Sequence, residues 1–213
     1  MSLEILRIVN APIDSNCYIV FDKSIGSDCI VVDPGSRDNA VLFEELEKWS
    51  LYPKYIVLTH EHYDHCWGVS GLLWKYQDSK VVCSVICSQA IQQPRLNYSH
   101  YCCPEEFSLK QADLVLDYND YNIKWSRYDL IFVPAKGHSA SGIFMLLEDA
   151  LFTGDTLLNN VRTITRYKTG SSLELIKSLA FLDSCKGKKY TVYPGHGEPF
   201  LLDGYDLSIA QRG

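Results

Sequence analysis

The sequence predicts an α/β fold, and three observations carry that prediction. Short runs of β-branched and aromatic residues alternate with segments of helical periodicity. The 213 residues are enough to bury a core in one domain, 1–213, and they leave little room for a second. Polar segments that contain histidine follow the predicted strands directly, at the strand ends where α/β folds place ligands.

The first sixty residues predict strands and then a helix. Three β-rich runs, 5–9, 17–21 and 29–32, stand between polar turns, and Asp33-Pro34-Gly35 ends the third run. Within 38–49, apolar residues recur at helical spacing among acidic and basic ones; they are Val41, Leu42, Leu46 and Trp49. This pattern predicts an amphipathic helix that covers a sheet.

The rest of the chain predicts a second series of strands. A buried-strand run at 55–58 leads into the first histidine segment, and a helix is expected at 68–76. Further strands are expected at 81–82, 130–133, 143–147, 150–152 and 190–193, with a late helix at 173–182. Ser171 and Glu174 have the spacing of a capping box, so both side chains are expected to bond amide groups at the start of that helix.

Composition and charge exclude several classes of protein. With 46% apolar and 22% charged residues, the chain has the composition of a globular protein. The net charge of −6 without a basic stripe disfavours nucleic-acid binding. The start of the chain lacks a secretory signal, and no window is apolar enough for a membrane span, which predicts a soluble, cytoplasmic protein with no membrane partner. Eight scattered cysteines without a Cys-x-x-Cys pair predict reduced thiols.

Five of the six histidines and two aspartates fall in four short segments. The candidate ligands are His60, His62, Asp64, His65, His138, Asp155 and His196. Seven imidazole or carboxylate ligands are too many for one tetrahedral ion and suit two ions that share a bridge. In an extended chain His60 and His62 point the same way, whereas Asp64 and His65 continue into a turn and can face a second ion. The pattern therefore predicts a binuclear metalloenzyme.

These motifs resemble those of the metallo-β-lactamase superfamily. The similar segments are His-x-His-x-Asp-His at 60–65, Gly-His at 137–138, Gly-Asp at 154–155 and Pro-Gly-His-Gly at 194–197, within a resemblance that runs from about 16 to 198. It implies a four-layered αβ/βα sandwich of two mixed β-sheets flanked by helices. It also implies one ion on His60, His62 and His138, another on Asp64, His65 and His196, and Asp155 as the bridge. We expect two divalent ions per chain, zinc first, with iron or manganese as alternatives that the same ligands accept.

The resemblance further implies a hydrolase in which a metal-bridging hydroxide cleaves a thioester, ester or lactone, with Asp64 positioning the hydroxide or taking its proton. Among small members of the family, the chain is most similar to glyoxalase II-type thioesterases, through 16–20 and 31–35. It departs from them in two ways. The helical C-terminal domain of typical glyoxalase II enzymes has no room after His196, and residues 157–168 replace their usual stretch after the bridging aspartate.

The replaced stretch carries three cations, Arg162, Arg166 and Lys168. They predict contact with an anionic group of a small-molecule substrate, and solvated surface charges are the equal alternative. Asp33, at a strand end, is either an acceptor that orients a histidine ligand or a turn-forming residue.

Two other functions stay open. One is a mononuclear iron dioxygenase acting on a persulfide, which the family also contains and which would use two histidines and the bridging aspartate. The other is a non-catalytic metal-binding protein, against which the intact Asp64 and Asp155 weigh. A nuclease of this fold is disfavoured because the chain has no basic surface. His100 and Cys102-Cys103 are expected to be structural, Cys66 is left out of the ligand set, and 89–107 is a lid, an interface or ordinary packing.

Overall fold

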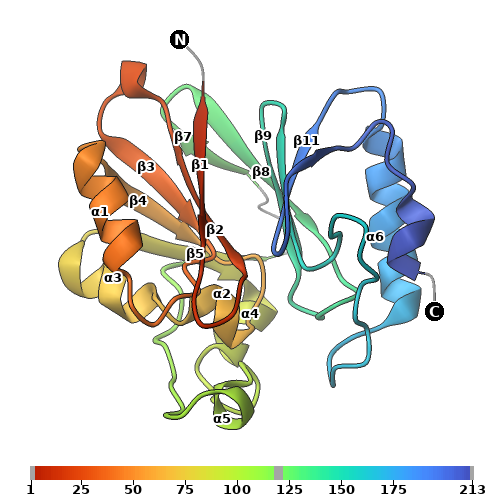
Figure 1. Ribbon diagram of the computed structural model, residues 1–213, viewed down its shortest axis with the longest axis horizontal. Helices are drawn as coiled ribbons and strands as arrows, with labels where there is room; N and C mark the ends of the chain where they lie inside the picture. Colours follow the sequence, from red (N-terminus) through yellow and green to blue (C-terminus); the bar gives the residue numbers. More distant parts are fainter. Residues whose placement is uncertain (1–2, 118–121, 212–213) are drawn as a thin grey trace. The chain divides into compact units, whose positions relative to one another are not determined.

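The computed structural model describes residues 3–117 and 122–211 (Figure 1). By its internal contacts the chain divides into two compact units, Met1–Val115 and Leu116–Gly213. Each unit is built on its own six-stranded sheet. The prediction of one domain over 1–213 stays a prediction.

The sheet of the first unit has the strand order β1-β2-β3-β4-β5-β6. Its strands are β1 (Glu4–Val9), β2 (Asn16–Phe21), β3 (Asp28–Val32), β4 (Tyr52–Val57), β5 (Lys80–Ser84) and β6 (Leu114–Leu116), the last of which spans the boundary between the units. The strands β1, β2 and β3 pair antiparallel, whereas β3, β4 and β5 pair parallel. The sheet is therefore mixed, and each parallel step needs a crossover.

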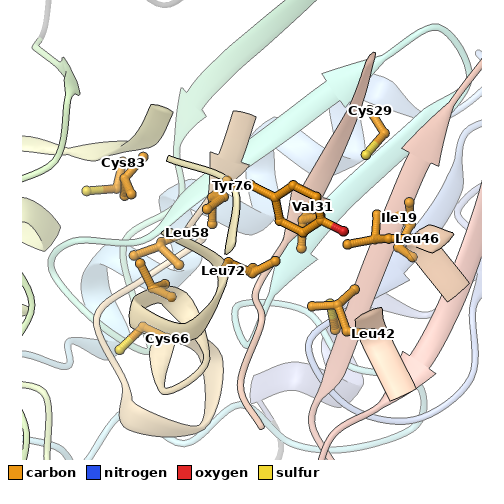
Figure 2. Close-up of a cluster of buried hydrophobic side chains, with 14 of the residues drawn as sticks. Ile19, Cys29, Val31, Leu42, Leu46, Leu58, Cys66, Leu72, Tyr76 and Cys83 are labelled. Atoms are coloured by element: carbon orange, nitrogen blue, oxygen red, sulfur yellow. The ribbon is translucent and has the colours of Figure 1, made fainter. Parts of the chain in front are cut away.

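Helices supply those crossovers and cover the sheet. They are α1 (Ala40–Lys48), α2 (Tyr63–Cys66), α3 (Val69–Lys75), α4 (Val85–Ala90) and α5 (Ser99–Cys102). Leu42 and Leu46 of α1 and Leu72 of α3 lie in one buried cluster with Ile19 and Val31 of the sheet (Figure 2). Burial of this apolar surface is what holds α1 and α3 against the strands.

The second unit has the strand order β12-β11-β10-β9-β8-β7. Its elements are β7 (Asn122–Trp125), β8 (Tyr128–Pro134), β9 (Ile143–Leu147), β10 (Ala150–Gly154), α6 (Ser172–Cys185), β11 (Thr191–Pro194) and β12 (Phe200–Leu201). Among the described strands of this sheet, β10 and β11 pair parallel and the other neighbours pair antiparallel, and α6 is the parallel crossover. Leu175, Leu179 and Leu182 of α6 share a buried cluster with Leu151 and Val192. Short 3-10 helices, Lys23–Ile25 and Leu207–Gln211, complete the two units.

Two mixed sheets flanked by helices confirm the predicted fold class. The strands and helices predicted from residue patterns are all present, with ends that differ by a few residues. The elements that the patterns missed are α2, α4, α5, β6, β7 and β12. The three helices among them have four to six residues, too short for a helical periodicity to show.

The capping box at 171–174 is half formed. The Ser171 hydroxyl accepts a hydrogen bond from the Glu174 amide at 3.3 Å, as predicted. The reciprocal bond was predicted wrongly, because the Ser171 amide donates to the Gly137 carbonyl at 2.8 Å. The Glu174 carboxylate instead pairs with Lys177 at 2.6 Å.

All eight cysteines are free, which agrees with the predicted reduced thiols. Burial raises the pKa of the Cys17, Cys66 and Cys87 thiols well above the ordinary value, so these groups behave as apolar packing. None of the helices in the described parts of the chain combines the length and the apolar character that a membrane crossing needs.

Candidate metal centre

Four of the predicted ligands lie directly after β4 in the first unit. His60 lies in a bend after the strand, His62 is in an extended conformation before α2, and Asp64 and His65 fall in the first turn of that helix. The three imidazole rings gather closely: the His60 ring centroid lies 4.6 Å from that of His62 and 4.3 Å from that of His65. All three histidines are buried. Such a cluster of basic groups in a buried place is suited to a cation that the rings share.

Asp33, at the end of β3, organises this segment. Its carboxylate accepts hydrogen bonds from the Thr59 amide at 2.8 Å and the Thr59 hydroxyl at 2.6 Å. It also accepts from His65 Nδ1 at 3.0 Å. Asp33, His60 and His65 have potential ligand atoms within 4.8 Å of one another. Because Asp33 already receives three donors, we assign it to orienting His65 rather than to the ligand set, as one of the two sequence interpretations predicted. Its φ of 51° lies in the left-handed region, at the point where β3 has ended.

The same network sets the tautomers of two histidines. The Thr59 hydroxyl donates its one proton to Asp33, so toward His60 Nδ1, 3.0 Å away, it acts as an acceptor. His60 therefore carries its proton on Nδ1, and the bond to Asp33 places the proton of His65 on Nδ1 as well. In both rings Nε2 is then the basic nitrogen, as a metal ligand requires.

The backbone of Asp64 is fixed by two contacts with earlier parts of the chain. The Ser15 hydroxyl donates to the Asp64 carbonyl at 2.5 Å. A Cβ added to Gly35 would lie 1.6 Å from that same carbonyl oxygen. Gly35 is therefore needed because the backbone of Asp64 passes where a side chain would be. The Asp64 Oδ2 atom lies 3.6 Å from His65 Nε2.

The second unit carries the other three predicted ligands, each after a strand. His138 follows β8 and donates from Nδ1 to the Ile164 carbonyl at 2.8 Å, so its Nε2 is also the basic nitrogen. Gly137, with a φ of 149°, lets this loop approach α6, because an added Cβ would lie 2.8 Å from the Leu175 Cα. The start of α6 thus holds the His138 loop in place.

Asp155 follows β10 and lies between two histidines. Its Oδ2 atom is 3.5 Å from Nε2 of His138 and 3.6 Å from Nε2 of His196. These separations are long for hydrogen bonds. They suit ligands of a common ion, because two ligands about 2.1 Å from one tetrahedral ion lie roughly 3.4 Å apart. One carboxylate oxygen at this distance from two imidazoles suits one ion held by all three groups or two ions that share the carboxylate. The Asp64–His65 pair has the same spacing.

The segment after β10 brings the three predicted cations toward His138. Arg162, Arg166 and Lys168 are all exposed. The segment that carries them supplies the Ile164 carbonyl to His138. The Tyr167 ring also stands perpendicular to the His138 ring, at 5.3 Å and an interplanar angle of 78°. Contact of the cations with a substrate stays a prediction.

Other residues singled out in the sequence lie outside this arrangement. His100 is exposed and pairs with Glu106 at 2.5 Å. The Cys66 thiol is buried and donates to the Glu61 carbonyl at 3.5 Å, which agrees with leaving it out of the ligand set. Burial raises the pKa of Cys103 to about 11.

Sequence reasoning missed three residues that contact the ligands. They are Thr59 on His60, Tyr98 on His62 and Tyr167 on His138. The position of Thr59 beside the first histidine was a usable signal. The two tyrosines carried none, because each approaches its histidine from about thirty residues away along the chain.

The chain belongs to the metallo-beta-lactamase superfamily, whose profile matches residues 11–196. Within that superfamily it is similar to proteins named hydroxyacylglutathione hydrolase from Tolumonas auensis, 31% identical over 90% of this chain, and from Buchnera aphidicola, 27% identical over 78%. The chain spans 65% and 56% of the length of these two relatives. It is also 29% identical to the probable polyketide biosynthesis zinc-dependent hydrolase PksB from Bacillus subtilis, over 84% of this chain and 72% of that protein.

Solved structures show the same fold. The B3 metallo-beta-lactamase BLEG-1 has a TM-score of 0.85 at 24% identity, covering 93% of this chain and 94% of that one. ETHE1 from Myxococcus xanthus has a TM-score of 0.74 at 18% identity, covering 97% and 88%. At these identities the likeness concerns the arrangement of the backbone alone.

Proposed function

We propose that the protein is a binuclear metal-dependent hydrolase that cleaves a thioester, ester or lactone. The observation that carries the proposal is Asp155, whose Oδ2 lies 3.5 and 3.6 Å from two histidine nitrogens. A carboxylate at these distances suits two ions that share it. Membership of the superfamily and the names of the relatives support the same chemistry.

In this proposal the seven ligands divide as they do in the family. One ion is held by His60, His62 and His138, and the other by Asp64, His65 and His196, with Asp155 shared. The donors are imidazole and carboxylate groups, which zinc, iron and manganese all accept. Zinc is the first choice because the Bacillus subtilis relative is named a zinc-dependent hydrolase.

Bound metal would lower the pKa of water to about 7 and would polarise the scissile carbonyl. The chain supplies the rest. The Asp64 carboxylate, its backbone set by Ser15 and Gly35, takes the proton of the attacking water. Asp33 and Thr59 keep His65 and His60 in the tautomers that present Nε2.

The partner in this proposal is a small anionic molecule, with a thioester as the first candidate. Arg162, Arg166 and Lys168 lie on the segment that contacts His138, where they would meet a carboxylate or phosphate of the substrate. Hydroxyacylglutathione, the substrate in the name of two relatives, is an anionic thioester. The net charge of −6 disfavours nucleic acid as a partner, and a cytoplasmic location stays a prediction.

The test combines metal content with turnover. Protein purified without added metal is analysed for zinc, iron and manganese, and hydrolysis of S-lactoylglutathione and of an aryl ester is measured. We expect two ions per chain and turnover that Asp64→Ala lowers by at least about 100-fold, the lower range for loss of a positioned acid or base. Asp183→Ala, on the exposed side of α6, is the matched control. One iron per chain with oxygen uptake on a persulfide and no hydrolysis would establish the dioxygenase instead.

A further inference from the structure

Residues 91–113, between α4 and β6 of the first unit, hold none of the proposed ligands, yet they are tightly anchored. The Asn97 side chain is fully buried and donates to the carbonyls of Ile91 at 3.3 Å and Phe107 at 2.9 Å. The Leu109 amide also donates to the Ile91 carbonyl, at 2.9 Å. These bonds close the segment into a loop whose two ends are joined.

A second set of bonds fixes the chain on either side of Tyr98. The Asn97 side-chain oxygen accepts from the Ser99 amide at 2.8 Å. The Ser99 hydroxyl accepts from the Phe107 amide and donates to the Phe107 carbonyl, both at 3.0 Å. The Phe107 ring in turn stacks on Trp67, just after the ligand segment, at 5.8 Å and 9°. Tyr98 therefore stands between two buried anchors.

Tyr98 itself has a backbone conformation that residues other than glycine rarely adopt. Its φ is 65° and its ψ is 1°, in the left-handed region. Such a conformation in a bulky residue persists only where the surroundings impose it, and it is often found where a side chain has a function. Asn97 and Ser99 are the residues that impose it here.

The ring of Tyr98 contacts His62, a predicted metal ligand. The Tyr98 ring lies 4.9 Å from the His62 ring with an interplanar angle of 87°, the perpendicular arrangement that aromatic rings prefer. On another side of His62, the His60 ring lies at 4.6 Å and 74°. His60 and His65 are oriented by hydrogen bonds from Thr59 and Asp33, whereas Tyr98 meets His62 with a ring.

We propose that Tyr98 is a positioning residue for the metal centre: the loop anchored by Asn97 and Ser99 presses its ring against His62 and fixes the imidazole in the direction that metal binding needs. This inference rests on the proposed function, because it takes His62 as a ligand. It gives the anchored loop the role of a support for one ion rather than that of a mobile lid. The ring, not the hydroxyl, carries the effect.

The test is a zinc titration of metal-free protein against a competing chelator, which needs no turnover. Tyr98→Ala and Tyr98→Gly are expected to weaken one of the two zinc affinities by about 10-fold or more, the range for loss of a residue that orients a ligand. Tyr98→Phe keeps the ring and is expected to bind both ions as the wild type does. Trp74→Ala, which removes an exposed aromatic ring of α3 in the same unit, is the matched control.

A second measurement isolates the strain. Without metal, Tyr98→Gly is expected to unfold at a higher denaturant concentration than Tyr98→Ala, because glycine adopts a positive φ without a steric penalty. If Tyr98→Ala does not fold, the pair of Tyr98→Gly and Tyr98→Phe carries the comparison of affinities. Wild-type zinc affinities in both ring-free variants, or an equal loss in Trp74→Ala, would overturn the role of Tyr98. A wild-type protein that takes up none of zinc, iron and manganese would overturn the proposed function and this inference with it.

Discussion

The two units supply their ligands in different ways. The first unit gathers four of them within six residues after a single strand, β4. The second unit draws three from loops after β8, β10 and β11, at positions 138, 155 and 196. The proposed ligands of the first unit, called the first half below, therefore form a continuous motif, and those of the second unit, the second half, come from segments that are distant in sequence.

The two halves are also held by different interactions. In the first unit, buried Asp33 bonds Thr59 and His65 directly, so a side-chain network sets the ligand geometry. In the second unit, the register of parallel strands places the ligands: the Gly195 amide donates to the Gly154 carbonyl at 2.8 Å, beside both His196 and Asp155. From this contrast we expect the first half to be preorganised without metal and the second half to depend more on the proposed ions.

The largest effect is expected at Gly35, where the first half is most crowded. Gly35→Ala would bring a Cβ within 1.6 Å of the Asp64 carbonyl oxygen. We expect a loss of about 3 kcal/mol in the free energy of unfolding, the upper range for overpacking. Gly204→Ala is the control, since an added Cβ meets nothing within 4 Å there. Denaturant unfolding measures both, and an unchanged midpoint for Gly35→Ala would contradict the close approach.

The next effect separates Asp33 from Asp155. Asp33→Ala removes the acceptor of three buried donors, so we expect metal-free protein to lose roughly 3 kcal/mol of stability. Asp155→Ala is expected to lower the stability of metal-free protein less than Asp33→Ala does. It is also expected to leave the protein with one bound ion instead of two. Chemical denaturation and metal analysis of both variants test this. Equal destabilisation by the two substitutions would remove the distinction between the halves.

Hydrogen exchange with and without zinc measures the contrast directly. The Thr59 amide bonds buried Asp33, and the His65 amide bonds the His62 carbonyl at 3.0 Å, so both are expected to be protected without metal. Zinc is expected to slow exchange more at 137–139 and 195–197 than at 59–65. The reverse order would show that the first half is the one that metal organises.

The smallest expected effect concerns the helix that holds the His138 loop. Ser171→Ala removes the N-cap of α6 and is expected to cost about 1 kcal/mol of stability. Glu174→Ala is expected to cost less, because its carboxylate pairs with exposed Lys177 and does not complete the capping box. Thermal unfolding of the two variants distinguishes them. A larger loss of stability for Glu174→Ala than for Ser171→Ala would instead support the predicted capping box.

Residue patterns predicted much of this protein. The alternation of β-rich runs and helical periodicity predicted the fold class and the longer elements, because hydrophobic period reflects local backbone geometry. The spacing of histidines and aspartates predicted a set of seven metal ligands, because a metal site needs several donors of particular kinds, and that set stays a prediction. Elements of six residues or fewer, such as α2 and α5, escaped because they span too little chain for a period.

The sequence by itself determined which potential metal-binding side chains the protein contains and which strands they follow. The tertiary structure decided what surrounds those donors: that Asp33 bonds His65 32 positions away, that the Ile164 carbonyl bonds His138 26 positions away, and that Tyr98 rests on His62. The physical reason is the distance along the chain over which each property is set. Donor identity and strand pattern are local properties of the chain, whereas tautomer, ring orientation and close backbone approach arise only when distant segments pack together.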